Sequence, residues 1–130
     1  MKNILGSALI VVLFCSFGSA SLKGVWEYCG GISNGTKTEK PTAYKLHRTY
    51  SGSSYEAFVI EPGEKNFKYE AGDYTLKADT CFETQTYSHL ASQTIGVTVP
   101  YTYTIAHDTL KFKGILPNGT PIEEYWKKVK

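Results

Sequence analysis

The chain has 130 residues, of which 20% are charged, and its 14 Lys and Arg residues nearly balance 12 Asp and Glu residues for a formal net charge of +2. This length suits one domain together with a targeting segment, and the scattered, balanced charges argue against a nucleic-acid-binding surface, which needs a basic stripe. All 10 tyrosines follow residue 20, mostly in strand-like segments, which is typical of an all-β protein.

Residues 1–20 have the pattern of a secretory signal peptide. Lys2 gives the positive start, residues 4–17 form an apolar run, and small residues end the segment at Ala20. The run is shorter than the ~20 residues that span a bilayer, so we expect cleavage after Ala20 and no stable membrane insertion afterwards. The exported part, 21–130, is then a single periplasmic or secreted domain with 13 basic and 12 acidic residues.

A lipoprotein is the alternative for the same segment. Cys15 would carry the lipid and anchor the protein to a membrane. A lipobox has a small residue directly before that cysteine, whereas this chain has Phe14. Signal cleavage is therefore the leading prediction, and the lipid-anchored form stays open.

The first predicted strand, 22–29, opens the domain. Period-two alternation places four of its side chains on one face, namely Leu22, Gly24, Trp26 and Tyr28. The only other tryptophan, Trp126, lies in the last predicted strand. A first and a last strand that each carry a tryptophan suggest a sheet closed on itself, with the two ends of the chain at one seam.

Short segments rich in β-forming residues recur between turn signals. We count eight of them, at 22–29, 43–50, 55–61, 67–78, 81–88, 95–106, 109–115 and 121–129. Most separators are short enough for hairpins, and no window keeps a capped helical stripe over three turns. The sequence therefore predicts an all-β fold, an eight-stranded antiparallel up-and-down β-barrel. The longest link, 30–42, is predicted as a lid, a short helical plug or a plain loop.

The later segments give the clearest inward faces. Alternation in 97–105 and 110–113 turns seven side chains inward: Val97, Val99, Tyr101, Tyr103, Ile105, Leu110 and Phe112. Pro100 lies on the outward set of the first segment and predicts a bulge or bend there, because proline cannot donate to a ladder. Asn118-Gly119 then gives the strongest hairpin signal in the chain.

The last segment mixes charge with a large aromatic residue on one face. That face holds Ile122, Glu124, Trp126 and Lys128. In an even-stranded up-and-down barrel the first and last strands are antiparallel neighbours. We therefore expect Trp26 and Lys128 to meet at the same rim.

These residues carry a resemblance to a known group of proteins. Gly24-x-Trp26, with a basic residue late in the last strand, resembles the lipocalin and fatty-acid-binding superfamily, in which a basic side chain packs over that tryptophan and seals the closed end of the barrel. Leu22-x-Gly24-x-Trp26, Gly72-Asp73-Tyr74-Thr75 and Glu124-x-Trp126-x-Lys128-Val129 are more closely similar to small secreted lipocalin-like proteins of Bacteroidetes-type bacteria, a domain family without assigned function. The resemblance implies a lipocalin-like barrel sealed by Trp26 and Lys128.

Motifs for catalysis or metal binding are missing from the sequence. His47, His89 and His107 each stand apart from other metal-ligand residues, and no nucleophile motif or phosphate-binding loop occurs. We therefore expect no enzyme, no metal and no cofactor. The acidic residues are spread along the chain, among them Glu56, Glu61, Glu64, Glu70 and Glu83. Two of them can converge only through the fold, so solvated faces are the default expectation.

Cys29 and Cys81 are the two cysteines of the exported part. An even pair in an exported protein favours a disulfide. The predicted topology argues against one, because it places the two residues toward opposite rims while bridged Cα atoms lie within ~7 Å. A disulfide would count against a simple meander.

The leading functional hypothesis is an exported, non-enzymatic binding protein. Its barrel mouth would hold a small, largely apolar ligand against inward aromatic residues, namely Tyr28, Tyr101, Tyr103, Phe112 and Trp126. The alternative is a protein-interaction module, such as an inhibitor of a secreted hydrolase, that uses the loops at 30–42 and 88–94. A third outcome is a solid core without a cavity, since an eight-stranded barrel is narrow enough for side chains to fill. We expect a monomer.

Overall fold

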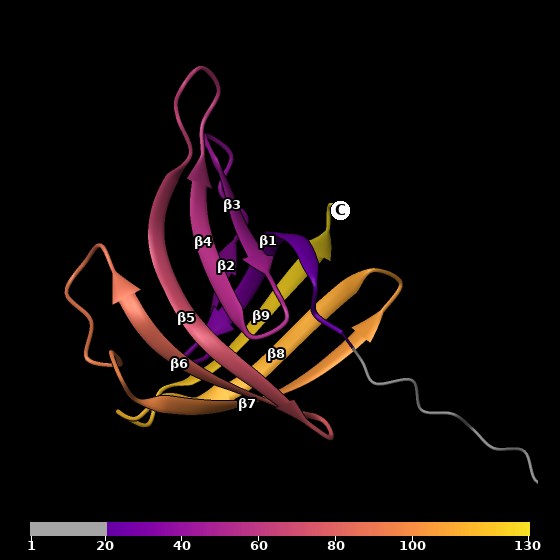
Figure 1. The fold of residues 1–130 in the computed structure, drawn as a ribbon, viewed down its shortest axis with the longest axis vertical. Helices are drawn as coiled ribbons and strands as arrows, with labels where there is room; N and C mark the ends of the chain where they lie inside the picture. Colours follow the sequence, from indigo (N-terminus) through magenta and orange to yellow (C-terminus); the bar gives the residue numbers. More distant parts are fainter. Residues whose placement is uncertain (1–20) are drawn as a thin grey trace, which may run out of the picture.

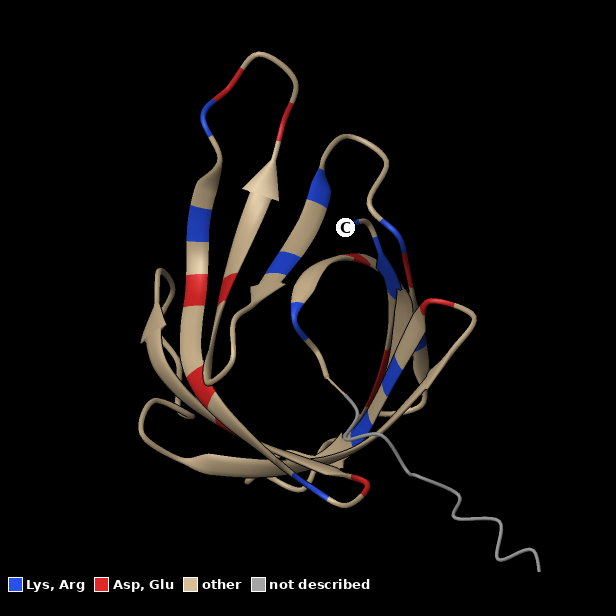
Figure 2. Cartoon of the chain, turned by 45° about the vertical axis from the view of Figure 1, so that its right-hand side comes forward, with Lys and Arg blue, Asp and Glu red and all other residues tan. Residues whose placement is uncertain are grey.

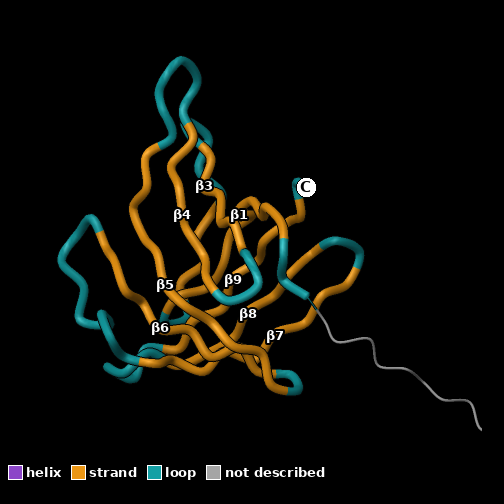
Figure 3. Tube along the Cα trace, viewed as in Figure 1, coloured by secondary structure: helices purple, strands orange, loops and turns teal. Residues whose placement is uncertain are grey.

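The computed structural model describes residues 21–130, which form nine β-strands (Figure 1). The strands are β1 (Gly24–Ser33), β2 (Thr36–Glu39), β3 (Lys45–Tyr50), β4 (Ser54–Ile60), β5 (Phe67–Lys77), β6 (Thr80–Ser88), β7 (Thr98–Ala106), β8 (Thr109–Ile115) and β9 (Pro121–Lys128). Loops and turns join them, and the described part contains no helix (Figure 3). It accordingly contains no helical segment long and apolar enough to cross a membrane. The predicted signal peptide and Cys15 lie outside the described residues.

The strands form one antiparallel sheet that closes into a barrel. Sequential neighbours pair from β3 to β9, and β1 pairs with both β3 and β9. The first part of β1 pairs with β3 and its last part with β2, so β2 and β3 together occupy a single position in the barrel wall. The wall therefore has eight positions, and the predicted eight-stranded antiparallel up-and-down barrel is confirmed.

The link predicted at 30–42 is largely a hairpin. Asn34 and Gly35 both have positive φ, 49° and 79°, as the central residues of a tight hairpin turn require. The predicted end of the first strand at residue 29 is wrong, because β1 continues through Gly30 and Gly31 to Ser33. A Cβ at Gly31 would collide with the carbonyl oxygen of Glu123, so glycine here permits close pairing of β1 with β9.

A β-bulge at Cys29 changes which residues of β1 face inward. The register with β9 shifts between Tyr28 and Gly30, and Cys29 is the additional residue. Before the bulge Tyr28 lies opposite Trp126, and after it Gly31 lies opposite Glu124. The inward set thus moves from even to odd residue numbers along the strand.

The hydrophobic core fills one end of the barrel. It contains Leu22, Trp26, Tyr50, Tyr55, Tyr74, Cys81, Tyr103, Leu110, Phe112 and Trp126. These residues come mainly from the starts of β1, β6 and β8 and from the later parts of β3, β5, β7 and β9. Antiparallel alternation brings those strand ends together, so this end is closed and the opposite end carries the rim.

The inward predictions for β7 and β8 hold in the middle of the strands. Val99, Tyr103, Leu110 and Phe112 are buried. Val97 and Ile105, at the two ends of the predicted segment, are 38% and 39% exposed because the closed wall does not extend that far.

The bulge expected at Pro100 is absent, since its pairing with β6 is regular. Pro100 lies one residue outside the part of β7 that pairs with β8, which begins at Tyr101. Its missing N–H therefore removes no hydrogen bond from that ladder.

Both cysteines of the described part are free. Cys29 is exposed at the bulge, and Cys81 is buried in the core. Because one thiol faces outward and the other inward, the fold keeps them apart, in agreement with the meander topology.

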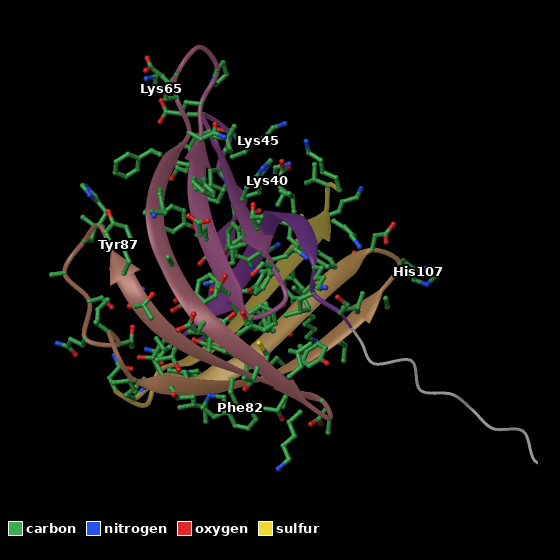
Figure 4. All side chains as sticks on the ribbon, viewed as in Figure 1. Lys40, Lys45, Lys65, Phe82, Tyr87 and His107 are labelled. Carbon is green, nitrogen blue, oxygen red and sulfur yellow. The ribbon has the colours of Figure 1, made fainter. Side chains whose placement is uncertain are left out.

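On the outer wall, Glu27 of β1 pairs with residues of β3 and of the connector that precedes it. Its carboxylate lies 2.9 Å from Lys40 Nζ, 3.8 Å from Lys45 Nζ and 3.0 Å from His47 Nε2. Figure 4 shows Lys40 and Lys45 in the same upper part of the molecule. In the described part, Lys and Arg residues are spread over several strands and loops (Figure 2).

Candidate functional site

The rim end of the barrel contains a cavity of about 290 Å³. Apolar side chains line its outer part, namely Ile32, Val97, Leu116 and Ile122. Arg48, Tyr55, Glu70 and Glu83 line its inner part, next to the core. The lining also includes Ser33, Gln85 and Thr94, so the outer part is mixed and the inner part is charged.

A second space of about 600 Å³ adjoins this cavity beside the connector between β2 and β3. Five residues line both spaces, namely Tyr28, Thr38, Arg48, Glu70 and Glu124. The second space also reaches Tyr69 and Trp126. Its position follows from the break between β2 and β3, which leaves only the 40–44 connector to cover that part of the wall.

Arg48 is the centre of a buried hydrogen-bond network between the cavity and the core. Its Nη1 donates to the Glu83 carboxylate at 3.0 Å and to the Tyr50 hydroxyl at 2.9 Å, and its Nη2 donates to Glu70 at 3.1 Å. Tyr50 in turn donates to Glu83 at 3.0 Å, and Tyr55 donates to Glu70 at 2.8 Å. Both carboxylates are thus held by one guanidinium and by tyrosine hydroxyls.

Aromatic rings hold the guanidinium in place. The Arg48 Cζ lies 4.6 Å from the centroid of Tyr55 and 5.3 Å from that of Trp126. Such contacts stabilise a cation that has lost its water. The Tyr55 ring has room because Gly72, beside it on β5, has no side chain.

One polar atom of this network has no partner among the described residues. The Nε–H of Arg48 is buried and makes no hydrogen bond, and the residue as a whole is only 8% exposed. A buried donor without a partner costs free energy of about 1–3 kcal/mol, and such a group calls for an explanation.

The shared burial changes the acid–base properties of the network. Burial raises the pKa of Glu83, and the Arg48 guanidinium and the Tyr50 hydroxyl, which favour the ionised form, offset this only in part. Burial also disfavours the Arg48 cation, but Glu83 and Glu70 outweigh it and raise the Arg48 pKa well above its ordinary value. Arg48 is therefore a permanent cation, whereas burial favours protonation of Glu83.

Glu124 forms a second polar position in the cavity, next to two aromatic rings. Its Oε2 accepts a hydrogen bond from Trp126 Nε1 at 2.9 Å. The rings of Tyr28 and Trp126 meet edge to face with centroids 5.3 Å apart. Burial, and after it the nearby Glu124 carboxylate, raises the pKa of Tyr28. Glu124, Tyr28 and Trp126 therefore form one group of side chains.

The residues predicted as ligand lining divide between the cavity and the core. Tyr28 and Tyr101 line the cavity, and Trp126 lines the adjoining space. Tyr103 and Phe112 instead belong to the core and are absent from the lining of both spaces. They sit too near the closed end, where the barrel is filled.

The predicted pair at the closed end comes together across the seam. Trp26 lies opposite Lys128 in the β1–β9 register. Lys128 Nζ lies 5.7 Å from the Trp26 ring centroid, while Trp26 Nε1 donates to the Leu22 carbonyl at 2.8 Å. This geometry suits the predicted seal.

Sequence reasoning missed Arg48, Glu70 and Glu83 as site residues. Each lies at an inward position of its strand, between inward neighbours such as Leu46 and Tyr50 on β3. A charged residue in the inward period of a strand was the available signal. Glu70 and Glu83 stood among the scattered acids whose convergence only the fold decides.

The histidines of the described part do not form a metal site. No group of three or more His, Cys, Asp or Glu side chains within residues 21–130 has the arrangement of a metal site. His107 lies in the β7–β8 turn (Figure 4), whereas His47 is on β3 and His89 directly follows β6.

Comparisons with known proteins give a family but no activity. No curated protein matches the chain. Among solved structures, the chain is similar to a redesigned β-barrel, with 14% sequence identity, a TM-score of 0.49 and coverage of 84% of this chain and 92% of that chain. The family model described as "Domain of unknown function (DUF4488)" matches residues 21–130, and the chain therefore belongs to this family.

Proposed function

We propose that this protein is an exported, non-enzymatic binding protein that holds a small ligand in a lipocalin-like barrel. The observation that carries the proposal is the cavity of about 290 Å³ at the rim end, adjoined by a space of about 600 Å³. Small-molecule sites are typically concave spaces of ~300–1,000 Å³ with a few polar groups that orient the guest. The proposal includes a source among Bacteroidetes-type bacteria, as the sequence resemblance implies.

The lining favours an amphipathic guest over the largely apolar one expected from sequence. Ile32, Val97, Leu116 and Ile122 at the outer part suit an apolar portion of the ligand. The Glu124 carboxylate in the lining accepts one hydrogen bond among the described residues, so it favours a guest with a polar group there.

The arrangement of Glu70 and Glu83 supports a binding role over a catalytic one for these two acids. Glu83 and Glu70 are both engaged by Arg48, and tyrosine hydroxyls donate to them as well. A general base must be free to accept a proton from a substrate within hydrogen-bond reach. Carboxylates held in this way position charge and are poor candidates for proton transfer.

Native mass spectrometry after mild extraction from the host tests the proposal. We expect a copurified small molecule, or a rise in melting temperature with a member of a panel of fatty acids, haem, bile acids, sterols and amphipathic amines. A ligand that binds only the folded state raises its apparent stability by about 2.7 kcal/mol at a hundredfold excess over Kd. An unchanged melting temperature across the panel, with no copurified molecule, would contradict the proposal.

A protein-interaction module is the second candidate. The side chains around the rim include several large exposed apolar residues, among them Phe67, Tyr87, Leu90 and Ile95, and Leu90 is 74% exposed. Figure 4 shows Tyr87 on the outer left of the molecule, near the β6–β7 loop. An inhibitor would use such a patch. Inhibition of a secreted hydrolase that is lost in Leu90→Ser, with ligand binding absent, would favour this candidate.

A further inference from the structure

We infer that the ligand carries a positively charged amine, held by the Glu124 carboxylate beside Tyr28 and Trp126, with a neutral oxygen acceptor that faces Arg48. This inference rests on the proposed function, because it requires a ligand inside the barrel. It specifies the chemical class of the guest and the residues that select it.

The charge of the lining supports a cationic guest. The charged residues that line the two spaces are Arg48, Glu39, Glu70, Glu83, Glu123 and Glu124. Glu39 and Glu123 have their own partners, Lys37 at 3.5 Å and Lys111 at 2.8 Å. Even with Glu83 protonated, the carboxylates of Glu70 and Glu124 outnumber the Arg48 guanidinium, although the chain as a whole is basic. Charge of one sign in a cleft attracts ligands of the other sign.

Glu124 is the carboxylate available to a ligand. Arg48 holds Glu70 and Glu83 directly, whereas Glu124 has a single hydrogen bond within the described residues, from Trp126 Nε1. Tyr28 and Trp126 stand beside it with their rings edge to face. The Tyr28 ring next to this carboxylate suits an ammonium group, since an aromatic ring attracts a cation and the carboxylate accepts its hydrogen bonds. The Trp126 ring already has the Arg48 guanidinium 5.3 Å from its centroid and bounds the site on the other side.

Arg48 supplies the second element of recognition. Its buried Nε–H has no partner among the described residues, and its side chain lines both spaces. Because Arg48 lines both spaces, a ligand oxygen in either of them would face its guanidinium. A carboxylate ligand is disfavoured, because Glu70 and Glu83 already occupy the guanidinium and would repel another anion. A carbonyl or hydroxyl oxygen near the amine fits the site.

Two matched series of probes test the inference by calorimetry on the purified protein. The aromatic series is tryptophanamide, N-acetyltryptophanamide and N-acetyltryptophan, and the aliphatic series is the same three forms of leucine. Within each series the side chain is constant and the charge changes: the amino-acid amide is a cation with a carbonyl group, the N-acetyl amide is neutral, and the N-acetyl amino acid is an anion. We expect the cation of at least one series to bind about tenfold or more tighter than its neutral form, as one charged hydrogen bond and the ring contacts provide.

Variants assign the preference to the residues. Glu124→Gln keeps the shape and an acceptor for Trp126, and should reduce the preference for the cation to within about twofold of the neutral form. The matched control is Glu56→Gln on the outer wall, where Glu56 pairs with Lys68 at 3.5 Å and is exposed; it should keep the full preference. Tryptamine lacks the carbonyl. It should bind several-fold more weakly than tryptophanamide if Arg48 donates a hydrogen bond to that carbonyl oxygen.

The outcomes separate this inference from the function on which it rests. Equal or tighter binding of the neutral or anionic probes would overturn the amine specificity and leave the binding function standing. A copurified ligand without a basic nitrogen would do the same. Failure of every probe, together with an unchanged melting temperature across the wider panel, would overturn both. The comparison among probes uses the unmodified protein, so it stands even if Glu124→Gln does not fold.

Discussion

Arg48 determines the electrostatic character of the barrel interior at the scale of single residues. Within residues 21–130, its guanidinium is the only basic group that lines the cavity and the adjoining space, and it neutralises part of the charge of Glu70 and Glu83. A buried charge without its partner is costly, whereas a complete pair is close to neutral for stability. The network therefore behaves as one unit.

Removal of Arg48 should destabilise the fold more than replacement of the whole pair. Arg48→Ala leaves Glu83 buried without its cation, and we expect a loss of about 3–5 kcal/mol in the free energy of unfolding from urea melts. The double variant Arg48→Met with Glu83→Gln should recover part of that loss. A single-variant loss below about 1 kcal/mol would mean that water reaches Glu83 in the folded protein.

Glu27 should make the protein sensitive to acid. The Lys40 ammonium, and after it His47, lowers the pKa of the Glu27 carboxyl in the folded state, against the opposing effect of burial. Since the folded pKa lies below the unfolded one, the stabilisation is present above the unfolded value of ~4.3 and is lost as the pH falls through the folded pKa. Glu27→Gln should therefore lower stability at pH 7 and weaken its dependence on pH below about 4.5.

Glu83 contributes to the pH dependence with the opposite sign. Its folded pKa is raised, so its contribution is present below the unfolded pKa and is lost as the pH rises through the folded value. Urea melts of the wild type, Glu27→Gln and the exposed Glu56→Gln, each at pH 7 and near pH 4, separate the two groups. An unchanged pH dependence in Glu27→Gln would show that its contacts are open to solvent.

At the scale of elements, the seam between β1 and β9 closes the barrel. β1 pairs along its length with β9, and the backbone pairing continues to Lys130, which accepts from Val25 N at 2.6 Å. The bulge at Cys29 lets the same strand turn Trp26 into the core and Gly31 toward Glu124. The one additional residue, Cys29, thus lets a single strand contribute to both the closed end and the cavity wall.

Trp26 should be the most sensitive position of this seam. Trp26 is 1% exposed, and we expect Trp26→Ala to cost about 3–5 kcal/mol in urea melts because it leaves a cavity in the closed end. Lys128→Met is the matched test of the cation above the ring and should cost under about 1 kcal/mol, as exposed cation–π contacts do. A loss under about 1 kcal/mol in Trp26→Ala would mean that Trp26 does not support the closed end.

For the whole molecule, the predicted export places the barrel outside the cytoplasm. Intact-mass measurement on material from the native host should give a chain that begins at Ser21. Cleavage removes Cys15, so this form carries no lipid. A mass that retains the first twenty residues, or one that includes lipid on Cys15, would contradict this prediction, and the latter would identify the lipid-anchored alternative.

The sequence by itself determined the fold class and most of the inward positions. Alternation is a local property of a strand, so it predicts that a side chain points inward without information on the adjacent strands. The four residues Trp26, Val99, Leu110 and Phe112 are examples, and all are buried. The turn residues between them made sequential pairing the economical topology, and closure followed from the two ends of the chain.

Only the tertiary structure decided where those inward faces leave a cavity and which charges meet there. A bulge shifts the alternation of β1 at Cys29, and no local pattern marks it. Arg48 contacts Glu70 and Glu83, which are 22 and 35 residues away in the sequence. These contacts depend on the registers of the β3–β4, β4–β5 and β5–β6 pairs. Burial of such charges is a property of the closed barrel, because a single strand can always present them to water.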